Sequence, residues 1–159
     1  MRRVRLLAFA TGSALLAACS ARPNPASDAA ATLRSADSAY SAGLRSMDVP
    51  GLVELYAPDA VMYPPGEPNV VGIDAVREFA KAFAATPSLT MSAERQTIVV
   101  SQSGDLGYVV NWVQTTAVDA HGKPTAERSR DIHLWRRDAT GQWKVVVDVW
   151  NALPADQKP

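Results

Sequence analysis

The segment RDIHLWRR, residues 130–137, alternates in the manner of a strand. Successive side chains of a strand point to opposite faces, so Asp131, His133 and Trp135 would share one face. An imidazole beside a carboxylate can bind, release or relay a proton near neutral pH. The segment is therefore a candidate for proton transfer or for polar contact with a ligand. A structural histidine on an exposed or dimer-forming sheet face fits the same pattern.

Hairpin turns on either side of this segment predict which residues lie opposite His133. A turn centred on Gly122 would place Asn111 across from His133, and a turn in the segment DATG would place Asp148 across from it on the other side. Directly opposed Cβ atoms in a sheet lie about 4.5–5.5 Å apart. The three polar side chains could therefore share hydrogen bonds, with Asp148 holding the imidazole and raising its pKa.

Both faces of the expected sheet are apolar. The face with His133 would carry Asn111, Val113, Asp131, Trp135, Val146, Asp148 and Trp150. An apolar and aromatic wall with a few convergent polar groups is typical of small-ligand pockets. The opposite face would carry Trp112, Ile132, Leu134, Val145, Val147 and Val149. The two faces are interchangeable at this level, because either could pack on the helices.

Helical and strand patterns divide the chain into two parts. Apolar residues recur at steps of three and four in residues 28–47, in a short segment after Asp48 and in residues 73–85, which predicts three helices. A short strand is expected at residues 59–63. The period then changes to two, which predicts strands in residues 89–103, 106–118, 125–137 and 142–150. Helices followed by an antiparallel meander indicate an α+β fold.

The composition is that of one ordinary globular domain. The 159 residues are 47% hydrophobic and 20% charged, with a formal net charge of +0, and they are numerous enough to bury a core. No basic excess argues for nucleic acid as a partner. Cys19 is the single cysteine, so no intrachain disulfide can form. No Cys/His spacing of a metal site is present, and we expect neither a metal nor a cofactor.

The first residues have the layout of a secretory signal. Three arginines precede an apolar run that is too short to span a bilayer, and LAAC, residues 16–19, resembles the bacterial lipoprotein box. We expect residues 1–18 to be a signal peptide that is removed, with Cys19 lipidated as the new first residue. The alternative is an ordinary signal cut near Ala18, which would leave a free thiol.

The expected mature chain is a tethered domain in the bacterial cell envelope. Lipidated Cys19 and a flexible tether would occupy residues 19–27, the domain residues 28–152 and a tail residues 153–159. Loss of the signal leaves 13 basic and 16 acidic residues, a formal charge of −3, so acyl chains rather than charge must hold the membrane. Ser20 is compatible with sorting to the periplasmic face of the outer membrane.

Several segments of residues 28–152 resemble the nuclear transport factor 2-like superfamily, in its SnoaL-like and ketosteroid isomerase-like branch. They are LYAPDAVMYPPG, the G-x-x-A-V-R-E-F of Gly72 to Phe79, SGDLGYVVN and GQWKVVVDVWN. The resemblance implies a cone-shaped half-barrel, in which three N-terminal helices pack on a curved antiparallel sheet around an apolar cavity. It also implies a possible homodimer through the outer sheet face, and it favours an inward-facing His133.

Ketosteroid isomerases combine an oxyanion hole, made of a tyrosine and a protonated aspartic acid, with an aspartate base that precedes a proline. In this resemblance Tyr40 matches the tyrosine and His133 the oxyanion acid, whereas the base position falls on Pro64. A proline cannot take a proton, so steroid isomerisation by that mechanism is not expected. Tyr40 and His133 could still donate hydrogen bonds to a ligand oxygen.

Three functions remain open. The first is binding of a small, mostly apolar molecule with a carbonyl, hydroxyl or carboxylate group, contacted by Tyr40, His133 and Asp148. The other expected contacts are Asn111, Asp131, Trp135, Trp150, Tyr56 and Tyr63. The second is isomerase, cyclase or hydratase-like proton transfer with the His133–Asp148 pair as base and Tyr40 as acid, which needs a neutral, accessible His133. The third is a non-catalytic interaction module whose cavity is filled by its own side chains.

Overall fold

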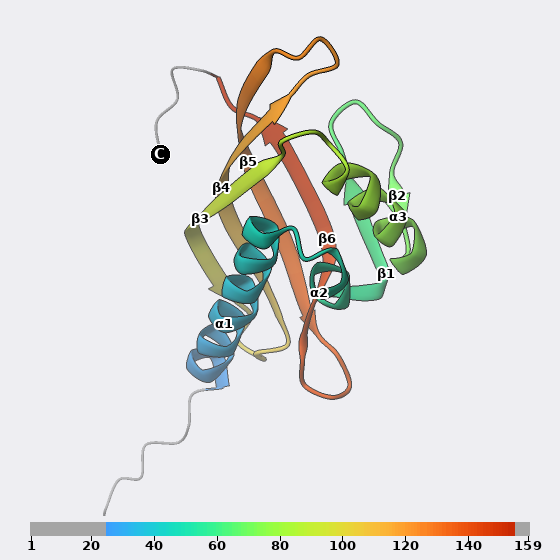
Figure 1. Cartoon of the computed structure of the whole chain (residues 1–159). Helices are drawn as coiled ribbons and strands as arrows, with labels where there is room; N and C mark the ends of the chain where they lie inside the picture. The colour runs from blue at the N-terminus through green and yellow to red at the C-terminus, as the bar shows by residue number, and fades with distance from the viewer. Residues whose placement is uncertain (1–24, 155–159) are drawn as a thin grey trace, which may run out of the picture.

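The computed structural model describes residues 25–154, and Figure 1 shows their arrangement. The elements are α1 (Pro25–Ser46), α2 (Val49–Glu54), β1 (Tyr56–Tyr63), β2 (Val70–Val71), α3 (Ile73–Ala84), β3 (Thr90–Val100), β4 (Leu106–Val118), β5 (Pro124–Arg137) and β6 (Trp143–Ala152). The expected signal peptide and Cys19 lie outside the described residues. None of the helices in residues 25–154 combines the length and the hydropathy that a membrane span requires.

The predicted elements are present, with shifted ends, and the short strand β2 is an element that the sequence analysis did not predict. Helix α1 begins at Pro25, inside the stretch expected to be tether, since proline suits the first turn of a helix, where its missing N–H is not needed. Asp48 caps α2 as expected, because its Oδ1 accepts a hydrogen bond from Gly51 N at 3.2 Å. Strand β1 begins at Tyr56, three residues before the start of the expected strand.

The fold is α+β, with three helices packed against one six-stranded sheet of order β2-β1-β6-β5-β4-β3. Strands β3 to β6 form the expected antiparallel meander. Strand β1 adds a parallel pairing with β6 that the meander pattern did not predict. All three helices lie over the same face of the curved sheet (Figure 1), so one face of the sheet is covered.

The register around His133 agrees with prediction on one side only. His133 pairs with Asp148 in β6, as expected. In β4, however, His133 pairs with Val109, and Asn111 pairs with Asp131, so the predicted Asn111–His133 pairing is wrong by two residues. The turn explains the shift, because Asp119 accepts hydrogen bonds from the backbone N–H groups of residues 121 and 123 and centres the turn on residue 121. A shift of two keeps each side chain on its predicted face.

A β-bulge in β6 changes two further assignments. Leu134 pairs with Val147, but Trp135 pairs with Val145, so Val146 is an extra residue on β6. Val145 is therefore fully buried beside Trp135, and Val146 is only partly buried. The predictions for Val145 and Val146 are both wrong, because strict alternation does not reveal a bulge.

The face that carries His133 is the one that packs on the helices. Asn111, His133 and Trp135 have no exposed surface, whereas Val149 on the opposite face is 36% exposed. Helix α1 supplies Leu33, Tyr40 and Leu44 to the same core. Gly107 permits this close approach, since a Cβ there would lie only 2.7 Å from the Leu33 side chain.

Candidate functional site

A cavity of about 220 Å³ lies between the helices and the inner face of the sheet. Its apolar lining comes mainly from the three helices. The helix residues are Leu44, Val49, Leu52, Val53, Val76, Phe79, Ala80, Phe83 and Ala84. Met47 between α1 and α2 adds to them, and Met62, Met91, Val113 and Trp150 come from the strands. Small-molecule pockets typically enclose about 300–1,000 Å³, so this cavity suits a small ligand.

A hydrogen-bonded chain of three side chains provides polar lining. The hydroxyl oxygens of Tyr40 and Tyr56 lie 2.9 Å apart, and the Tyr56 hydroxyl donates to Asp148 Oδ2 at 2.5 Å. The chain joins α1, β1 and β6, and all three residues line the cavity. Asp131 also lines it from β5. The cavity therefore combines an apolar body with a few convergent hydroxyl and carboxyl groups.

His133 lies behind this lining. Its ring centroid is 4.3 Å from that of Tyr40, and its Nε2 lies 3.0 Å from Asp131 Oδ2 and 3.6 Å from Asp148 Oδ1. His133 is not among the described residues that line the cavity. Its imidazole is thus placed to balance two carboxyl groups rather than to touch a ligand directly.

Burial and neighbouring charge shift the protonation of these groups. Desolvation lowers the pKa of His133, but the carboxylates of Asp131 and Asp148 outweigh it and raise that pKa to about 9. Burial, together with the charge of Asp131, raises the pKa of Asp148 to about 7. Burial and the nearby Asp148 also raise the pKa values of Tyr40 and Tyr56 well above 10. At neutral pH both tyrosines keep their protons and His133 carries a positive charge.

Asp131, His133 and Asp148 could also hold a cation. One ligand atom from each lies within 4.8 Å of the others. Asp131 Oδ1, His133 Nε2 and Asp148 Oδ1 are buried and make no hydrogen bond to any residue that the structure describes. The sequence analysis brought these three residues together but expected no metal, because carboxylates in strands have no diagnostic spacing for a metal site.

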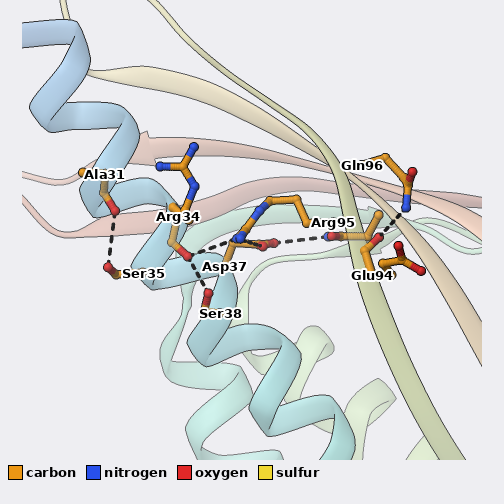
Figure 2. A network of polar contacts seen from close by, with 9 residues as sticks. Ala31, Arg34, Ser35, Asp37, Ser38, Glu94, Arg95 and Gln96 are labelled. Carbon is orange, nitrogen blue, oxygen red and sulfur yellow. Dashed lines mark hydrogen bonds and ion pairs between the residues drawn. The ribbon is translucent and has the colours of Figure 1, made fainter.

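A third buried acid among the described residues, Asp37, was missed by the sequence analysis. It lies on α1 with no exposed surface, and Figure 2 shows it facing Arg95 of β3. Arg95 donates to Asp37 Oδ2 at 2.8 Å, and Asn111 Nδ2 donates to Asp37 Oδ1 at 3.2 Å. Asp37 falls on the apolar face of the helix, three residues before Tyr40, which is the signal that could have revealed it.

The predicted catalytic and ligand-binding residues other than Tyr63 divide into two groups. Tyr40, Tyr56, Asp131, Asp148 and Trp150 line the cavity. His133, Asn111 and Trp135 are fully buried beside it, and the cavity lining does not include them.

Tyr63 is 41% exposed and lies outside the cavity lining, so its prediction as a ligand contact is not supported. Tyr63 is the last residue of β1 and is exposed, whereas Met62 before it is buried, so Tyr63 lies on the side of the strand away from the cavity. The sequence missed three polar lining residues of β4 and β5, namely Thr115, Glu127 and Ser129, because they fall in strand segments without a chemical motif.

Comparison with known proteins gives a family match. The model of the SnoaL-like domain matches residues 38–146. That match includes Tyr40, Tyr56 and the Asp131–His133 segment but ends before Asp148. No curated protein matches.

Solved structures share the fold. A ketosteroid isomerase-like protein from Erwinia carotovora atroseptica is 26% identical, with a TM-score of 0.70 over 79% of this chain and 96% of that chain. An NTF2-like protein of unknown function from Pseudomonas putida is 22% identical, with a TM-score of 0.67 over 84% of this chain and 98% of that one. An NTF2-like protein with a cystatin-like fold from Novosphingobium aromaticivorans is 18% identical, with a TM-score of 0.65 over 81% and 84% of the two chains.

Proposed function

The chain belongs to the SnoaL-like domain family, and from that premise we propose that it binds a small, mostly apolar molecule in the cavity beneath its helices. The observation that carries the proposal is the lining, in which the apolar and aromatic side chains meet the hydrogen-bonded Tyr40–Tyr56–Asp148 chain. The apolar body of a ligand gains from leaving water, and its polar end finds hydroxyl and carboxyl groups that are already held in place.

The unfilled cavity also favours ligand binding over the hypothesis of an interaction module. That hypothesis needs an interior filled by the domain's own side chains. About 220 Å³ of the interior is unfilled, and Asp131 and Asp148 both reach it. A buried polar group without a partner costs free energy, so these carboxyl groups favour a cavity that receives a ligand.

Filling the cavity tests the proposal. Native mass spectrometry of the chain, purified from envelope extract, should reveal a retained molecule. Ala80 lines the cavity from α3, so Ala80→Trp should remove the retained mass. Ala82 lies on the exposed side of the same helix, and Ala82→Trp should keep it. Circular dichroism establishes that both variants fold. A retained mass that survives Ala80→Trp, or no retained mass in the parent protein, would contradict the proposal.

A second candidate function is proton transfer of the isomerase, cyclase or hydratase type. It is favoured by one observation, namely that the carboxyl of Asp148 lines the cavity with its pKa raised to about 7, near the value that suits an acid–base catalyst at neutral pH. His133 does not meet the requirement of a neutral base, because its pKa is raised to about 9. The base would then be Asp148, with Tyr40 or Tyr56 as the proton donor.

The matched ketosteroid isomerase position gives no other base. Pro64 has no proton acceptor in its side chain, and it lines an outer groove rather than the cavity. In this candidate function, Asp148→Asn abolishes turnover of a retained substrate while leaving its binding measurable. Turnover that persists in Asp148→Asn would exclude this candidate.

The lipid anchor is a separate proposal. We propose that Cys19 carries acyl chains that hold the domain at the bacterial envelope, supported by the LAAC segment and the arginines that precede it. Metabolic labelling with an alkyne-tagged palmitate should mark the protein and place it in the membrane fraction. Cys19→Ala should lose both label and membrane association, and retention of either would contradict the proposal.

A further inference from the structure

Building on the proposed function, we infer that the ligand of the cavity is a small apolar amine, bound as its ammonium ion by Asp148 and Asp131. This assignment is narrower than the carbonyl, hydroxyl or carboxylate ligands that the sequence suggests. It rests on the charges, the free acceptor atoms and the aromatic rings of the lining.

The charged side chains of the lining have one sign. Among the described residues, the ionisable carboxyl groups that line the cavity are those of Glu127, Asp131 and Asp148, and no lysine, arginine or histidine lines it. A carboxylate ligand would meet like charges in a site of low polarity, which is unfavourable. A cationic ligand would meet opposite charges.

Two buried carboxyl oxygens, in two residues that line the cavity, make no hydrogen bond in the described part of the chain. They are Asp131 Oδ1 and Asp148 Oδ1, and the two side chains are only 10% and 3% exposed. An ionised carboxylate accepts hydrogen bonds and donates none, whereas an ammonium group has three donors and no acceptor. A carbonyl ligand cannot donate a hydrogen bond to a carboxylate, so an ammonium group complements Asp131 and Asp148 better.

Among the described residues, the buried carboxyl groups outnumber by one the cations that face them. Arg95 pairs with the buried Asp37 at 2.8 Å, while the imidazole of His133 serves both Asp131 and Asp148, at 3.0 Å and 3.6 Å. One positive charge therefore faces two carboxyl groups. A bound ammonium ion would supply the second positive charge and would favour the ionised form of Asp148.

Aromatic rings complete a surface for an organic cation. Tyr40, Tyr56, Phe79, Phe83 and Trp150 line the same cavity. A cation over the face of an aromatic ring is attracted by the ring quadrupole, and the hydrocarbon part of an amine packs on the remaining apolar wall. The small cavity, about 220 Å³, limits the ligand to a compact amine.

Three probes that share one ring test the assignment: benzylamine, benzyl alcohol and benzoate. Each is titrated into the full chain by isothermal titration calorimetry, at neutral pH and with EDTA present to exclude metal ions. Benzylamine should bind at least about tenfold more tightly than benzyl alcohol, as expected for hydrogen bonds to a charged group. Benzoate should show no binding.

Variants identify the carboxyl groups responsible. Asp148→Asn and Asp131→Asn keep the side-chain shape and remove a charge, and each should weaken benzylamine binding by about tenfold or more. Asp74→Asn is the matched control, because Asp74 is an exposed acid of α3, and it should leave the affinity unchanged. Because two variants are used, the assignment can still be tested if one of them does not fold.

The outcomes separate this inference from the proposed function. Equal binding of benzylamine and benzyl alcohol, or tighter binding of benzoate, would overturn the amine assignment and leave a small-molecule site. A molecule retained from extract that contains no basic nitrogen would do the same. If no probe binds, the amine assignment is wrong. The proposed function fails as well only if native mass spectrometry finds no retained molecule in the parent protein, or finds one that survives Ala80→Trp.

Discussion

The Tyr56 hydroxyl donates a 2.5 Å hydrogen bond to Asp148 Oδ2, across the parallel pair of strands β1 and β6. The bond links β1, which follows the first two helices, with β6, which is the last strand in the sequence. Tyr40 extends it to α1, because its hydroxyl lies 2.9 Å from that of Tyr56. The same chain of hydrogen bonds therefore forms part of the cavity wall and holds α1 against the sheet.

Tyr56→Phe should lower the free energy of unfolding by about 1.5–3 kcal/mol, since it removes a donor from a buried carboxyl group. Urea denaturation measures the change. Tyr63→Phe is the matched control, because Tyr63 ends the same strand and is 41% exposed, and it should change the stability by less than about 0.5 kcal/mol. Equal effects of the two variants would contradict a role for the Tyr56–Asp148 bond.

His133 should keep its proton well above neutral pH. Its pKa is raised from 6.5 to about 9 by Asp131 and Asp148, against the lowering by burial. Because the folded protein binds this proton more tightly, the stabilisation is fully present below about pH 6.5 and is lost as the pH rises through about 9.

The imidazole resonances of His133 in NMR spectra should accordingly titrate near pH 9. His121→Asn assigns them, since the chain has 2 histidines. Titration of the His133 ring near its ordinary value of 6.5 would show that the two carboxyl groups do not hold the proton.

Arg95→Met should destabilise the fold by about 3 kcal/mol, because it leaves Asp37 buried without its cation. Arg77→Met serves as the comparison, since Arg77 pairs with Asp74, whose side chain is 90% exposed. Breaking this exposed pair should cost less than about 1 kcal/mol. Chemical denaturation of both variants measures the difference, and a loss in Arg95→Met no larger than in Arg77→Met would contradict the importance of the buried pair.

We propose that the outer face of the sheet forms a homodimer, because Trp112, Ile132 and Leu134 are only partly buried there and Val149 is 36% exposed. Light scattering after size exclusion should give the mass of a dimer for the parent protein. Val149→Arg should give a monomer, since it places a charge in an apolar interface. Val71→Arg, at a 65% exposed position of β2, should remain dimeric. A monomeric parent protein would contradict the proposal.

The sequence by itself determined the types and order of the elements other than β2, and most of the composition of one sheet face. Periodicity of three to four residues in α1 and of two in β5 is local, so it does not depend on the rest of the fold. Asp131 and His133 share a face in every register, because residues two apart in one strand point to the same side of the sheet. The Asp148 pairing was also accessible, since a short turn joins β5 and β6.

Only the tertiary structure decided which face turned inward and what His133 touches. Both faces of the sheet are apolar, so the choice depended on the packing of α1, whose residues lie far from β5 in the sequence. The same packing placed Tyr40 over His133 and buried Asp37 against Arg95. The bulge at Val146 and the parallel pairing of β1 with β6 arise from long-range strand contacts, which local spacing does not encode.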